Sequence, residues 1–148
     1  MATPKRESVM TAFKNLLRTI MPVNGYSFDV SQNVYDWREA PISSTECPAI
    51  ICRDIVETIF VAVGLHLHNL KVQMELILME GVTPAQMRQF IADVTYCLGQ
   101  HLTLDALVSD IRPIEGEDIV IEQHENKIGF ARMSVIVEYT TEPWNPYQ

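Results

Sequence analysis

Cysteine and long apolar runs are both scarce in this 148-residue chain. The three cysteines, Cys47, Cys52 and Cys97, are odd in number and show no CxxC spacing, which argues against a disulfide framework or a zinc knuckle. We expect buried or half-buried reduced thiols, as suits a reducing cytoplasm. No apolar run reaches the roughly 18 residues of a membrane span, and no apolar signal core follows Met1–Arg6. These absences predict a soluble domain without membrane contact.

The motifs of the common enzyme classes are missing as well. The sequence has no GxSxG, P-loop, GxGxxG or HExxH pattern. Glu117 and Asp118, neighbours in the sequence, would point to opposite faces of a strand. Neither Cys52 nor Cys97 has a base close to it in the sequence, although a nucleophilic cysteine needs one. We therefore predict no catalytic residue, no cofactor and no enzymatic activity.

A weak metal candidate remains in the segment His66-Leu67-His68, which places two imidazoles on one face of a strand. A metal site needs a third and a fourth ligand, and the sequence nominates none. The interpretation that we favour is two polar side chains on a solvated strand face. A small metal-dependent enzyme using His66 and His68 stays open as the less favoured alternative.

Positive charge is scarce in the second half of the chain. Residues 1–74 contain seven basic and seven acidic side chains, whereas residues 75–148 contain four and twelve, which accounts for the whole net charge of −8. Acidic residues are densest from Asp105 to Glu125, and basic residues are densest in the first helix. An acidic half disfavours nucleic-acid recognition, which needs Lys and Arg on the phosphates. The split fits either two solvated faces or head-to-tail contact between identical copies, which closes a ring when the rotation permits.

Hydrophobic periodicity predicts two helices and a sheet. Apolar residues at helical spacing predict a first helix from Lys5 to Met21. A capping box from Thr83 to Gln86, with Pro84 between, begins a second helix that ends at Gly99. The expected strands are 26–35, 49–52, 54–63, 67–80, 104–111, 118–124 and 128–139, with a loop at 36–48, a hairpin turn at 125–127 and a bulge at Gly129.

The order α-β-β-(β)-β-α-β-β-β predicts a single α+β domain over residues 1–148. Strands that cluster between two helices favour a mainly antiparallel, mixed sheet packed against both helices. Ile77 and Met79 make the second face of the strand 67–80 apolar near its end. We therefore expect a helix or a neighbouring subunit to cover that end on both sides.

Three groups of residues suggest contacts with other proteins. Trp37 and Arg38, in the expected loop, are residue types that anchor interfaces, although Trp37 could equally fold back over the core. Residues 142–148 form an extended tail because prolines cannot stay in a sheet, and we expect Trp144 and Tyr147 to reach another subunit. The third group consists of charged residues. We expect the basic helix of one copy, with Lys14 and Arg18, to contact the acidic region of the next copy, with Glu115, Glu117 and Asp118.

Several passages of the chain, in order, carry a family resemblance. The first is the N-terminal helix leading to Asn24-Gly25-Tyr26, with Val34 downstream. The next passages are Glu46-Cys47-Pro48-Ala49-Ile50, His68-Asn69-Leu70-Lys71-Val72, the helix from Thr83-Pro84 to Asp93-Val94, and the closing strand from Ala131 to Tyr139. With these passages the chain resembles the tail terminator, or tail completion, proteins of long-tailed bacteriophages and prophages, which are minor tail proteins.

The resemblance implies a ring, typically of six copies, at the head-proximal end of the viral tail. Such a ring ends polymerisation of the tail tube protein and presents a surface to the head-side connector or neck protein, while DNA passes through its lumen without specific binding. The protein would be assembled in the host cytoplasm and end in the virion. No catalysis and no cofactor are implied. A head-closing adaptor of the neck, also a ring protein without enzymatic activity, is the alternative.

Two regions acquire expected roles from this resemblance. The loop Asp36–Pro48 is our candidate for an axial contact with the tube. Part of the acidity between Asp105 and Glu125 would face the lumen, where like charge keeps DNA from sticking, or would face the neighbouring subunit's Lys14 and Arg18.

Overall fold

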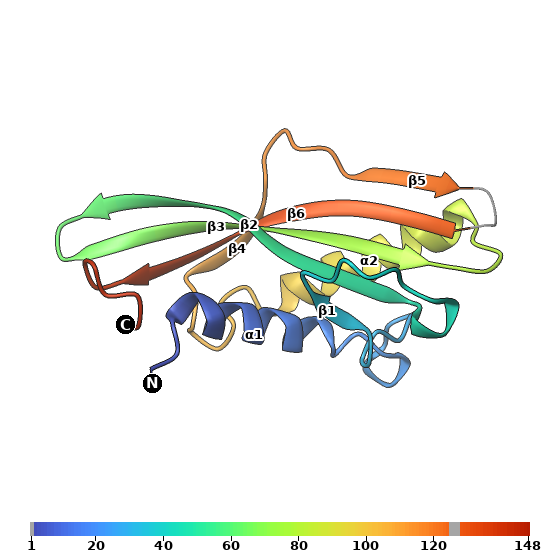
Figure 1. Ribbon diagram of the computed structural model, residues 1–148, viewed down its shortest axis with the longest axis horizontal. Helices are drawn as coiled ribbons and strands as arrows, with labels where there is room; N and C mark the ends of the chain where they lie inside the picture. Colours follow the sequence, from blue (N-terminus) through green and yellow to red (C-terminus); the bar gives the residue numbers. More distant parts are fainter. Residues whose placement is uncertain (1, 125–127) are drawn as a thin grey trace.

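The computed structural model describes residues 2–124 and 128–148. In this part of the chain two α-helices accompany a six-stranded sheet (Figure 1). The order of helix, strands, helix and strands confirms the predicted α+β class. The elements are α1 (Lys5–Leu17), β1 (Val34–Asp36), β2 (Ala49–Ala62), β3 (Leu65–Leu78), α2 (Pro84–Gln100), β4 (Asp110–Pro113), β5 (Val120–His124) and β6 (Ile128–Thr141). None of the described helices is long and apolar enough to cross a membrane.

Three long strands form the centre of the sheet. The strand order is β1-β2-β3-β6-β4, and β5 also pairs with β6. β1 runs parallel to β2, whereas the other recorded pairs are antiparallel. β4 ends opposite Val135 and β5 begins opposite Arg132. The connector 114–119 between β4 and β5 therefore does not pair with β6. One border of the sheet is therefore formed by β1 and β2, and the other by β4 and β5.

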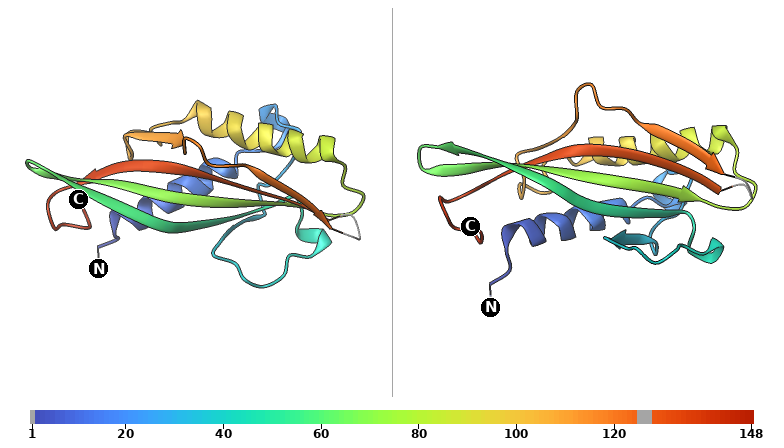
Figure 2. Two further views of the ribbon diagram at one scale, coloured as in Figure 1. Left: turned by 90° about the horizontal axis from the view of Figure 1, so that it is seen from above. Right: turned by 45° about the horizontal axis from the view of Figure 1, so that its top comes forward.

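One face of the sheet carries both helices and the main core (Figure 2). Phe13 of α1 and Phe90 of α2, both in the predicted apolar stripes, are fully buried there. The alternate residues of β3 that were expected to share one face are buried against them; these are Leu70, Val72, Met74, Leu76 and Leu78. Because burying each such side chain contributes about 1.5–3 kcal/mol, this face fixes the register of β3.

The opposite face of the sheet is covered only near its β1 end, among the described residues. Ile42 of the loop packs with Ala49, Ile51 and Ile77, and Met79 lies against this cluster. The expected cover over Ile77 is thus present. It is provided by the subunit's own loop rather than by a helix or a neighbour.

The predicted strand at Tyr26–Tyr35 is wrong apart from its last two residues, because only Val34–Asp36 forms a strand. The backbone N–H groups of Ser27 and Phe28 both donate to the Asp93 carboxylate of α2, at 3.0 Å each. The Asp93 side chain therefore accepts the hydrogen bonds that these N–H groups would have donated to a neighbouring strand in a sheet. The alternation of Tyr26 and Phe28 reflects packing on the core, not strand pairing.

Four further boundaries differ from the predictions. Segments 49–52 and 54–63 form the single strand β2, which absorbs a register shift between Asp54 and Val56. Most of the strand expected at 104–111 is replaced by turns in which residues 104–106 have positive φ, and β4 begins only at Asp110. β5 begins two residues later than expected. α1 ends at Leu17, short of Met21.

Gly129 pairs in register with both β3 and β5, so the predicted bulge is wrong. A Cβ at this position would meet Sδ of Met87 at 2.6 Å and Cγ1 of Val82 at 2.8 Å. Position 129 requires glycine because α2 and the segment before it pack directly against the backbone of β6 there. The expected hairpin turn at 125–127 lies outside the described residues.

The three cysteines are unpaired and buried or half-buried, as predicted. Burial raises the pKa of Cys52 to about 12 and that of Cys47 to about 11. Both are therefore protonated at neutral pH, which makes them poor nucleophiles.

Candidate assembly interface

The distal part of the β2–β3 hairpin, residues 55–67, projects at the end of the molecule that holds both termini (Figure 1). We call these residues the arm. Its turn places Gly64 at a φ of 79°, a conformation that glycine adopts without strain. Residues 58–67 contain no Asp, Glu, Lys or Arg. The exposed large apolar side chains of the arm are Ile55, Val56, Ile59, Phe60, Val61 and Val63.

The arm also presents an unpaired backbone edge. β1 covers only residues 50–52 of β2, and no described strand pairs with the outer edge of residues 55–62. An exposed, apolar edge strand is a template for pairing with another chain. This edge lacks the Lys and Pro residues that usually prevent such pairing.

Other positions along the sheet border are capped by basic side chains from the N-terminal helix and the residue after it. The carbonyl of Val34 accepts from Arg18 at 3.0 Å, that of Asp54 from Arg6 at 3.0 Å, and that of Thr140 from Lys5 at 2.7 Å. The basic helix therefore protects edges of its own sheet.

The second border of the sheet has a similar apolar strand. Ile119, Val120 and Ile121 are all exposed, and β5 pairs with β6 on one side only, within residues 2–124 and 128–148. β4, by contrast, ends at Pro113, which has no N–H to offer to a further strand.

His66 in the arm and His68 directly after it lie on the helix side of the sheet, so the predicted solvated face is wrong. The exposed fractions are 9% and 8%. Nε2 of His68 is 2.8 Å from Oγ1 of Thr141, and Nδ1 is 3.1 Å from Oε1 of Glu57. The imidazole also stacks on Tyr139 at a ring-centroid distance of 4.6 Å. No three His, Cys, Asp or Glu residues of the described chain gather as a metal site would require.

The row of hydroxyl, imidazole and carboxylate made by Thr141, His68 and Glu57 has the order that hydrolases use to activate a nucleophile. Here Thr141 is only 5% exposed, so a substrate has little access to the hydroxyl. Glu57 also accepts from the hydroxyl of Tyr139 and pairs with Arg6 at 3.4 Å. Burial raises the pKa of Tyr139, and the hydrogen bond to Glu57 raises it further. This network connects all three central strands to α1 at the root of the arm.

The loop that contains Trp37 and Arg38 is held by its own ion pair. Arg38 contacts Glu46 through both terminal nitrogens, and its guanidinium lies 4.5 Å from the ring centre of Tyr35. These hydrogen bonds from Arg38, with those from Ser43, lower the pKa of Glu46 to about 2. Nε1 of Trp37 donates to Asp54 at 2.7 Å, and its ring is about half exposed. Trp37 therefore neither joins the core nor projects freely.

The remaining predicted interface residues are not gathered into one site. Lys14 pairs with Asp36 of its own subunit at 3.1 Å, and Arg18 is bound to β1 as described above. Trp144 is 91% exposed, and its ring lies edge-on to His66 with 5.5 Å between the ring centres. The predicted extended form of the tail 142–148 is wrong, because the segment folds back through turns and the N–H of Glu142 donates to the carbonyl of Gln148 at 2.6 Å. The tail packs beside the start of α1, where the carbonyl of Pro146 accepts from the N–H of Lys5. Contacts of these residues with another copy stay predictions.

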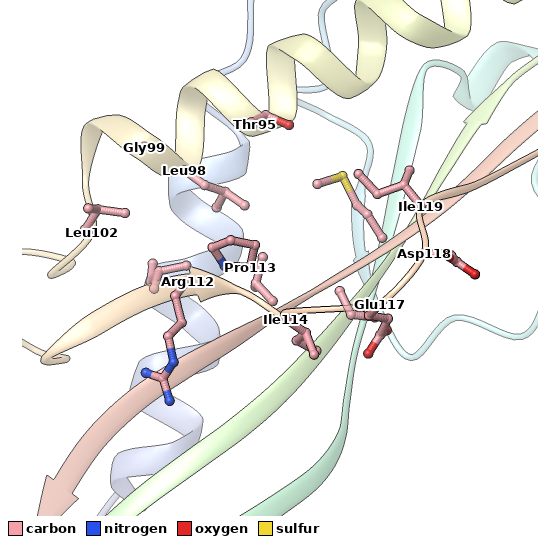
Figure 3. A pocket seen from close by; sticks show the side chains of 14 residues that line it. Thr95, Leu98, Gly99, Leu102, Arg112, Pro113, Ile114, Glu117, Asp118 and Ile119 are labelled. Atoms are coloured by element: carbon pink, nitrogen blue, oxygen red, sulfur yellow. The ribbon is translucent and has the colours of Figure 1, made fainter.

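Glu115, Glu117 and Asp118 lie in the connector between β4 and β5, and Glu117 and Asp118 line a hollow of about 280 Å³ (Figure 3). Apolar side chains form most of its wall; they include Leu98, Leu102, Ile111, Ile114, Ile119 and Met133. Glu117 is bound by Lys71 at 2.9 Å, which lowers its pKa. The lining contains no imidazole and no thiol, so the hollow can accept an apolar side chain but offers no paired nucleophile and base.

Sequence reasoning missed the two unpaired edges. The signal in the sequence was the stretch 58–67, which combines β-branched residues with a complete lack of charge. The positions of the edges depend on which strands become neighbours, and that information is not local.

Comparison with known proteins adds no further identification. No protein-family model matches the chain, and no curated protein matches it.

Proposed function

We propose that this chain is a structural virion protein that forms a ring on the head-proximal end of a phage tail tube. The ring ends tube polymerisation and provides the surface for joining head and tail. The observation that carries the proposal is the arm, an exposed apolar hairpin on an otherwise acidic domain. Exposed apolar groups that form a contiguous surface mark sites of protein–protein contact. The family resemblance then supplies the kind of assembly.

The proposed task requires two different surfaces. One must fit the last ring of the tube, and the other must not repeat it, because otherwise growth would continue. The molecule has such asymmetry, since the arm and the loop 37–48 lie toward opposite ends of the sheet (Figure 1). We assign neighbouring-copy contacts to the arm and the axial tube contact to the loop.

The acidic connector fits a channel for DNA. Glu115 and Asp118 are exposed, and the second half of the chain has an excess of eight negative charges. An acidic lumen repels the phosphate backbone, so DNA can pass without binding. A ring structure with an electropositive lumen would contradict this part of the proposal.

Electron microscopy of virus particles made without this protein tests the function. A terminator predicts overlong tails, because nothing stops the tube. Tails of normal length that are detached from heads would instead identify the neck adaptor. Correctly sized tails joined to heads would reject both.

A second test uses purified tube protein. Wild-type protein should cap growing tubes and shorten them, whereas Val61→Glu combined with Val63→Glu should not, because charges in the arm oppose its burial. Val23→Glu is the matched control, since Val23 is also exposed and apolar but lies outside the arm. Equal capping by all three proteins would remove the arm from the mechanism.

A further inference from the structure

The two unprotected borders of the sheet are complementary to each other. Residues 55–62 of β2 form one, and residues 119–124 in and before β5 form the other. They lie at opposite edges of the same sheet and toward opposite ends of the molecule (Figure 1). Elsewhere Lys5, Arg6 and Arg18 cap backbone carbonyls of the sheet, whereas no side chain among residues 2–124 and 128–148 caps these two places in the same way.

We propose that the outer edge of β2 in one copy pairs with the outer edge of β5 in the next copy, so that the sheet continues from subunit to subunit. The inference rests on the proposed function, because it names the contact that joins the ring. The occupant of each edge is a second copy of this chain.

Hydrogen bonding supports this pairing first. An edge strand has a row of backbone N–H and C=O groups that is a template for pairing with another extended segment. The two segments have similar lengths, eight and six residues. Each therefore offers the other a ladder of comparable extent.

The side chains support it as well. Ile59, Phe60 and Val61 on one edge and Val120 and Ile121 on the other are exposed, and cross-strand pairs of aromatic and β-branched residues stabilise a sheet. Within these stretches only Glu57 and Glu122 carry a charge at neutral pH. Glu57 is already bound by Arg6 and Tyr139, so the contact requires no new burial of an unpaired charge there.

Geometry distinguishes this contact from a simple dimer. A pairing of β2 with β2 would be isologous and would end at two copies. A pairing of β2 with β5 is heterologous and leaves one unpaired edge on each side, so further copies can add, and the assembly closes into a ring when the rotation between copies permits.

Proline at single edge positions tests the proposal. Successive N–H groups of a strand point alternately to the neighbouring strand and away from it. Proline has no N–H. Of the two variants Ile59→Pro and Phe60→Pro, one therefore loses a hydrogen bond to β3, and the other loses only an N–H group that points outward from the sheet. Val120→Pro and Ile121→Pro form the same kind of pair in β5. Hydrogen exchange of the backbone amides in β3 and β6 shows which proline variant of each pair keeps the native fold. That variant is the edge-blocked variant for the next experiment.

Native mass spectrometry then counts the copies. We expect wild-type protein to assemble beyond dimers at concentrations up to about 1 mM, with or without tube protein. Each edge-blocked variant alone should be monomeric, and an equimolar mixture of the two should give a dimer and nothing larger. Val23→Pro, outside both edges, should assemble like the wild type.

Three outcomes would overturn the pairing. They are a β5-blocked variant that still dimerises alone, edge-blocked variants that assemble normally, and a wild-type protein that stays monomeric throughout. In the second case, tube capping by the same variants would show that the proposed function stands without this contact. A wild-type protein that fails to cap tubes would instead reject the proposed function itself.

Discussion

At the scale of single residues, Asp93 connects two distant parts of the chain. It lies on the buried face of α2, where its carboxylate accepts from the backbone of Ser27 and Phe28 and from Gln89. The segment before β1 has no ladder of its own at these residues. The carboxylate therefore determines the path of that segment.

Asp93→Ala should lower the free energy of unfolding by about 1.5–3 kcal/mol, because two backbone N–H groups lose a charged acceptor. Asp93→Asn keeps an oxygen in place and should cost less. Urea unfolding measures both. An alanine variant as stable as the wild type would show that water replaces the carboxylate.

Gly129→Ala should destabilise the fold by about 1–3 kcal/mol, since the new methyl group meets Met87 and Val82. Gly99→Ala is the matched control, because nothing lies within 4 Å of a Cβ at that helical position. The control should gain up to about 1 kcal/mol of helix propensity. Thermal unfolding of the two variants in parallel checks the opposite signs.

At the scale of elements, the loop 37–48 shows how an irregular segment becomes ordered. Its Ile42 covers the second face of the sheet, and its ion pair between Arg38 and Glu46 closes the loop on itself. The sequence indicated a long loop and an apolar face at Ile77, but nothing in the pattern joined the two. Their contact depends on the return of the chain over the sheet.

The stability of this loop should depend on pH through Glu46, whose pKa falls from its ordinary 4.5 to about 2 in the folded protein. The folded pKa lies below the unfolded one, so the contribution is complete above about pH 4.5 and is lost as the pH falls toward about 2. The difference in melting temperature between the wild type and Glu46→Gln should therefore be constant above pH 5 and should shrink below it. A difference independent of pH would contradict the role of this ion pair.

At the scale of the whole molecule, a net charge of −8 opposes self-association while the apolar edges favour it. Lys14 and Arg18 are engaged within the subunit, so the basic helix has less charge to offer an acidic neighbour than the sequence indicated. Edge pairing and charge pairing then predict opposite responses to salt.

Raising ionic strength from about 0.01 M to about 0.1 M shortens the screening length from about 30 Å to about 10 Å. If apolar edges join the copies, this change should strengthen association, because repulsion between like-charged subunits weakens. Light scattering at both salt concentrations measures it. Weaker association at the higher salt would favour contact between the basic helix and the acidic region.

The sequence by itself determined the helices, the core face of β3 and the class of fold, because periodicity records which side of an element avoids water. It also determined the start of α2, since the capping box at Thr83 is local chemistry. The tertiary structure decided that His66 and His68 are buried, that Asp93 replaces a strand ladder, and that no described strand pairs with two edges of the sheet. These features arise when residues far apart in the chain meet, and a local pattern of apolar and polar residues does not specify the partner.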